Sequence, residues 1–127
     1  MRRKICVLAV TIAMIIALEL TLTGYTRAAM EGYIALVGEI GGMIRLEDLE
    51  GAAERLPSII RGWEETRAVV EIWISHDEAE EVARHLRDLN TYLNLRAVDD
   101  SLEILESLIS ALEHIRHKNR LTLANLL

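Results

Sequence analysis

The sequence has few residues that break helices or crosslink chains, since its 127 residues include one proline and one cysteine. It also has no phenylalanine. A single cysteine excludes an intramolecular disulfide and a zinc site built from cysteines. Scarce proline, together with abundant Leu, Ala, Glu and Arg, favours helix over sheet. No stretch of alternating apolar and polar residues predicts a strand. These absences predict an all-α protein.

The body of the chain is also poor in positive charge. Residues 28–127 carry 10 Lys and Arg against 19 Asp and Glu, a net charge of −9. Proteins that bind nucleic acid need a basic surface to contact the phosphates. We therefore expect no nucleic acid among the partners of this protein.

A basic start and a long apolar run make up the beginning of the chain. The opening MRRK places three cations before the run, which holds that end in the cytoplasm under the positive-inside rule. As a helix, residues 5–26 would extend about 33 Å, enough to cross a hydrocarbon core of about 30 Å. We expect a single-pass protein of the cell membrane, with residues 1–27 as cytoplasmic start and signal anchor and residues 28–127 as an extracytoplasmic helical domain.

A cleaved secretory signal peptide is the alternative for this segment. Its uninterrupted apolar part, residues 5–18, suits a signal-peptide core, and Thr26-Arg27-Ala28 makes a mediocre cleavage site. Glu19 disfavours a full span, because an acid at mid-membrane costs about 3 kcal/mol, but it lies past the midpoint, where that cost falls. Both alternatives place the remaining chain outside the cytoplasm.

Apolar residues recur at intervals of three and four through the rest of the chain, as on one face of a helix. A helix continuing from the membrane is expected to end at Gly41-Gly42; the alternative is that the Gly38-x-x-x-Gly42 spacing lets two helices approach closely. Asp48 is a candidate N-cap for the next helix. Pro57 either kinks that helix or opens a new one. A third helix is expected over about residues 76–95 and a fourth after a short turn. We predict a small bundle of about four helices after the membrane segment, arranged as two stacked hairpins, with an apolar tail that docks somewhere on the protein.

Ser75, His76 and Asp77 are three residue types that serine hydrolases use. A catalytic triad needs these side chains to converge, whereas adjacent residues diverge around the backbone. Ser75 followed by Glu78 three positions later matches a capping box, which starts a helix. We therefore predict a structural role for Ser75 and Glu78 and assign no catalytic residue; the role of His76 stays open.

Two other residue pairs are candidates for a site. His114 and His117 are three positions apart, but a zinc site needs three or four ligands and no third is specified by spacing. They are therefore only weak metal candidates, and we expect no cofactor. Trp63 and Trp73 lie on an apolar stripe, which is typical of core residues rather than of a ligand groove.

Several motifs resemble those of a known family. They are W-I-S-H-D-E (residues 73–78), L-x-x-L-x-x-Y (residues 86–92), E-H-I (residues 113–115) and the terminal L-T-L-A-N-L-L. Together they resemble the small bacterial membrane family called domain of unknown function 4363. The resemblance implies a helical protein with a single N-terminal membrane anchor, and it brings no assigned catalytic or binding residues. It also implies an acidic residue where this chain has Ser75, which argues further against a nucleophilic serine.

The leading function hypothesis is a non-enzymatic scaffold or protein-interaction module at the outer face of the cytoplasmic membrane. Its partners would be the membrane and a protein that is not identified by the sequence, and a homo-oligomer stays open. The alternative is an extracytoplasmic ligand- or metal-sensing domain that uses His114 and His117. A secreted hydrolase is the third hypothesis.

Overall fold

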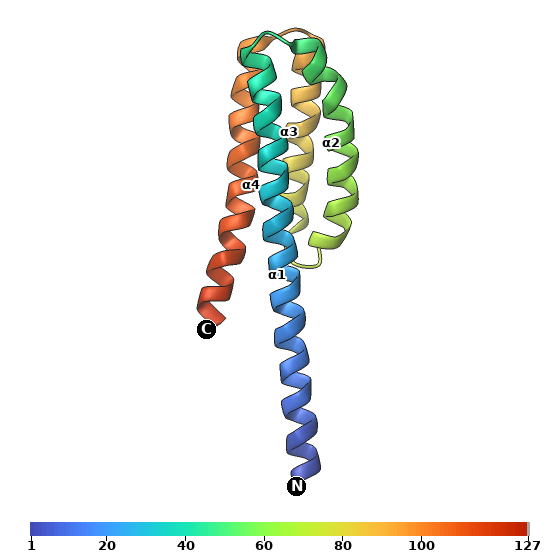
Figure 1. Ribbon diagram of the computed structural model, residues 1–127, viewed down its shortest axis with the longest axis vertical. Coiled ribbons are helices and arrows are strands. Elements are labelled where there is room, and N and C mark those ends of the chain that lie inside the picture. Colours follow the sequence, from blue (N-terminus) through green and yellow to red (C-terminus); the bar gives the residue numbers. More distant parts are fainter. Residues whose placement is uncertain (127) are drawn as a thin grey trace.

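The computed structural model describes the backbone of residues 1–126 and the side chains up to residue 118, and this part of the chain forms four helices (Figure 1). They are α1 (Arg2–Arg45), α2 (Leu49–Val70), α3 (His76–Asn94) and α4 (Val98–Leu126). Short turns join them, so consecutive helices run antiparallel. Both α1 and α3 pack against α2 and α4, which gives a four-helix bundle. The predicted all-α fold is confirmed, while the side chains of the predicted apolar tail, residues 121–127, lie outside the described residues.

One continuous helix, α1, is both the apolar N-terminal segment and the first helix of the bundle. Among the described residues it is the helix that is long and apolar enough to cross a membrane. Its N-terminal half projects from the bundle with exposed apolar side chains, and one face becomes buried from Thr23 onward. The helix runs past the Gly41-Gly42 pair to Arg45, so the pair does not end it. Gly41 instead lets α4 approach closely, because a Cβ there would lie 3.3 Å from the side chain of Leu105.

The polar side chains of the projecting segment are partly satisfied within the helix. The hydroxyl of Thr11 donates to the carbonyl of Val7 at 2.7 Å, and that of Thr21 donates to the carbonyl of Ala17 at 2.8 Å. Such bonds matter in hydrocarbon, where water is not present to pair with polar groups. These threonines are therefore compatible with a lipid environment.

Local signals set the start of α2. The Asp48 carboxylate accepts a hydrogen bond from the Gly51 N–H at 3.0 Å and so caps the helix. Pro57 lies inside α2 without ending it, and its side chain is exposed. The sequence allowed either a kink or a new helix at Pro57. Residues 49–70 form one helix of 22 residues that contains Pro57.

Trp63 ties three helices together in the core. Its side chain is fully buried, and its indole N–H donates to the carbonyl of Ala79 in α3 at 3.1 Å. The ring also meets Tyr33 of α1 edge-on, with 5.3 Å between the ring centroids. Trp73, in contrast, is only half-buried and packs at the edge of the core.

Trp63→Phe is expected to lower the free energy of unfolding by about 1–3 kcal/mol, because the buried Ala79 carbonyl loses its donor and the ring leaves a void. Urea unfolding of the full chain in detergent micelles measures this loss. Trp73→Phe is the matched control and should cost less. Equal losses for the two variants would contradict the role given to Trp63.

Candidate functional site

The Ser75-His76-Asp77 stretch lies in the turn between α2 and α3. The Ser75 hydroxyl accepts a hydrogen bond from the Glu78 N–H at 3.1 Å, so Ser75 is the N-cap of α3. The His76 Nδ1 atom lies 3.1 Å from a carboxylate oxygen of Glu71. Within the described part of the chain, the serine hydroxyl and the imidazole therefore have separate partners and do not pair as a nucleophile and base.

Glu78 differs from the capping box that its position predicts. In such a box its carboxylate would bond back to the backbone N–H of Ser75. Here the Oε1 atom accepts a hydrogen bond from Lys118 of α4 at 2.7 Å. Glu78 therefore links the start of α3 to α4, and only the serine half of the box is seen among the described hydrogen bonds.

A network of charged side chains, centred on Arg67, joins α2 to α3. The Arg67 guanidinium is 10% exposed and donates to Glu71 at 2.8 Å and to Glu80 at 2.9 Å. Arg87 reaches the other oxygen of Glu80 at 2.7 Å. Hydrogen bonds from Arg87, and then from Arg67, lower the pKa of the Glu80 carboxyl to about 2. The network therefore holds the ends of two helices together across the turn.

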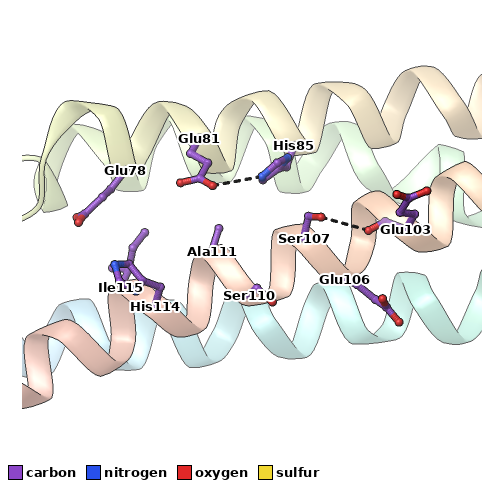
Figure 2. Close-up of a pocket in the computed structure, with 10 residues that line it drawn as sticks. All are labelled: Glu78, Glu81, His85, Glu103, Glu106, Ser107, Ser110, Ala111, His114 and Ile115. Atoms are coloured by element: carbon purple, nitrogen blue, oxygen red, sulfur yellow. Dashed lines mark hydrogen bonds and ion pairs between the residues drawn. The ribbon is translucent and has the colours of Figure 1, made fainter.

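A groove of about 790 Å³ runs between α3 and α4 (Figure 2). The close-up shows lining side chains on both helices, with Glu81 and His85 of α3 opposite Ala111 and Ser107 of α4. From α3 the polar lining residues are Glu78, Glu81 and His85, and from α4 they are Glu103, Glu106, Ser107, Ser110 and His114. With four glutamates among its lining residues, the groove is an acidic surface.

Two polar atoms in the lining of this groove are buried without a hydrogen-bond partner among the described residues. They are the Oε2 atom of Glu78 and the Nδ1 atom of His85. The other ring nitrogen of His85 lies 3.6 Å from Glu81. An unpaired buried polar group costs about 1–3 kcal/mol.

The structure separates the two histidines that the sequence offered as weak metal candidates. His114 lines the α3–α4 groove, whereas His117 lines a smaller pocket of about 190 Å³ with Arg27, Glu31 and Arg116. Two guanidinium groups beside His117 disfavour a bound cation there. Among the described residues, no group of three His, Cys, Asp or Glu side chains lies close enough to hold a metal ion.

The fold and the groove define a class: an all-α protein in which one membrane-length helix continues into a four-helix bundle with an acidic groove. The family described as Domain of unknown function (DUF4363) matches residues 21–126, and the chain belongs to this family. The match includes all of α2, α3 and α4 and residues 21–45 of α1, so it covers the bundle as one unit. No curated protein and no solved structure matches the chain.

Sequence reasoning missed both the Arg67 network and the groove. Part of the network had a local signal, because Glu64 and Glu71 lie three and four positions from Arg67. Glu80 had no such signal, since it is 13 positions away and meets Arg67 only when the helices pack.

Acidification is expected to weaken the protein through Glu80. Its pKa is about 2 in the folded protein and 4.5 in an ordinary environment, so its stabilising contribution is full above pH 4.5 and is lost as the pH falls toward 2. Arg87→Ala should raise the pKa of Glu80 toward 4.5, because Arg87 is the largest cause of the shift. An NMR titration of the Glu80 carboxyl carbon measures it.

Arg84→Ala is the matched control for that titration, because it removes another arginine of α3. This variant should leave the pKa of Glu80 at about 2. A normal Glu80 pKa in the unmodified protein would contradict the network.

Proposed function

We propose that this chain is a single-pass membrane protein whose bundle stands at the outer face of the cytoplasmic membrane as a non-enzymatic docking module. The α3–α4 groove is its binding surface, and a basic segment of a partner protein is its ligand. Support for the anchor comes from the basic MRRK start, the exposed apolar half of α1 and the internally bonded threonines.

The observation that carries the docking role is the composition of the groove. It brings four glutamates together in a concave surface between two helices. Lysine and arginine side chains supply the positive charge and the hydrogen-bond donors that carboxylates accept. Charge complementarity of this kind steers association and selects a partner more than it adds affinity.

A non-enzymatic role agrees with the way the candidate catalytic residues are used. The Ser75 hydroxyl caps a helix, and His76 is paired with Glu71. These side chains support the helix junction, and the groove lies between the two helices that follow. We infer that the groove binds its ligand without reacting with it.

Charge reversal in the groove tests the docking role. A photo-crosslinking amino acid at Ser110 is expected to capture a defined protein in native membranes, with the contact mapping to a basic segment. Glu103→Lys/Glu106→Lys should reduce that crosslink at least tenfold, because attraction becomes repulsion. Quantitative mass spectrometry of the crosslinked peptides measures the change.

The matched control reverses two exposed glutamates of α2, Glu50→Lys/Glu54→Lys, which lie outside the groove. This variant should keep the crosslink. A crosslink that survives the groove reversal, or that disappears equally in the control, would exclude the groove as the docking surface.

The anchor is tested by the state of the N-terminus. An uncleaved anchor is expected to keep residues 1–27 in the mature protein and to resist extraction from membranes by alkaline carbonate. Mass spectrometry of the mature N-terminus measures this. A mature chain that begins near Ala29 and is released from the membrane would show that the segment is a cleaved signal peptide.

A further inference from the structure

The turn between α2 and α3 exposes apolar side chains at one end of the bundle. Ile72 is 74% exposed and Val69, one helical turn before it, is 40% exposed. Trp73 stands next to Ile72 and is half-buried. Ile74 is buried in the core and fixes the turn to the bundle. The turn is thus a firmly held apolar surface.

Because α1 and α2 pack antiparallel, the α2–α3 turn can be placed beside a particular residue of α1. The Tyr33 hydroxyl of α1 lies 2.8 Å from the Thr66 hydroxyl of α2. Ile72 follows Thr66 by six positions and Arg27 precedes Tyr33 by six, so each lies about 9 Å from that contact, toward the same end of the bundle. Figure 1 shows the turn at the end from which the N-terminal half of α1 projects. Ile72 therefore lies near the level of Arg27, where the apolar segment ends.

We propose that Ile72 and Trp73 contact a lipid surface, the interfacial layer of the bilayer that α1 crosses; this inference rests on the membrane anchoring proposed above. Lipid is the expected contact because the exposed apolar half of α1 begins at the same height along the bundle as this turn. The two apolar surfaces are therefore continuous. Tryptophan is suited to this layer, because its ring is apolar and its N–H is polar. Glu71, the charged residue next to Ile72, is paired with Arg67. Contact at α1 and at this turn would hold the bundle upright on the membrane.

The other two turns provide an internal comparison. They carry single exposed leucines, Leu46 and Leu95, of which Leu95 is 70% exposed. Both lie at the opposite end of the bundle, about 28 Å away by the 19-residue length of α3. Leu46 lies between Arg45 and Glu47, and Leu95 lies between Asn94 and Arg96, whereas the α2–α3 turn has three apolar residues in a row.

Site-specific labelling of the full chain tests the contact. The Cys6→Ser substitution first removes the native cysteine, so that only an introduced cysteine is labelled. The fluorophore NBD is then attached to Ile72→Cys in one protein and to Leu95→Cys in a second protein, which is the matched control. Both proteins are reconstituted into phosphatidylcholine vesicles with or without doxyl-labelled lipid. We expect blue-shifted emission at residue 72 and at least threefold stronger quenching by doxyl lipid than at residue 95.

Flotation of the vesicles separates this inference from the anchor on which it rests. Protein that floats with the vesicles but is not quenched at residue 72 would overturn the lipid contact and leave the anchor standing. A blue shift without doxyl quenching would also overturn it, because a second copy or another protein would then cover the turn. Protein that does not float would overturn both.

Intrinsic fluorescence gives a second readout without a label. Trp63 is buried in the core, so quenching by brominated phosphatidylcholine should come mainly from Trp73 and should be lost in Trp73→Phe. Equal quenching in that variant and in the unmodified protein would contradict a lipid contact at the turn.

Discussion

The continuity of α1 is the constraint on which the rest of the structure depends. One unbroken helix of 44 residues passes from an exposed apolar segment into a protein core. A helix satisfies its backbone polar groups internally, so it can change surroundings without interruption, and only its side chains need to change. That change begins at Thr23, where one face becomes buried. Helices α2 and α4 pack against α1, and α3 packs against α2 and α4.

The α2–α3 turn shows how this constraint acts on a local motif. The Ser75 cap and the Arg67 network stabilise the turn from both sides, one at the start of α3 and one between the helices. A turn held in this way can keep Ile72 exposed without unravelling. Ser75, His76 and Asp77 thus belong to a structural junction at the end of the bundle nearest the apolar segment, and His76 gains a partner in Glu71.

The proposed docking surface and the proposed lipid contact lie on different parts of the bundle and use different physics. The α3–α4 groove is lined by carboxylates, whereas the turn presents apolar side chains. Under these two proposals, the separation would leave the groove open to a partner while the turn contacts lipid. Lys118 of α4 pairs with Glu78, a residue of the groove lining close to the start of α3.

Local sequence by itself determined the helical class, the apolar N-terminal segment and the caps at Asp48 and Ser75, because each depends on residues within a few positions of one another. Tertiary structure alone decided which side chains share a surface. Glu78 meets Lys118 across 40 positions of sequence, and no spacing rule predicts that pair. His114 and His117 are close in sequence, yet they line different pockets because α4 packs between α3 and α1. The groove exists only where two helical faces meet, so it depends on the packing of the whole bundle rather than on any one segment.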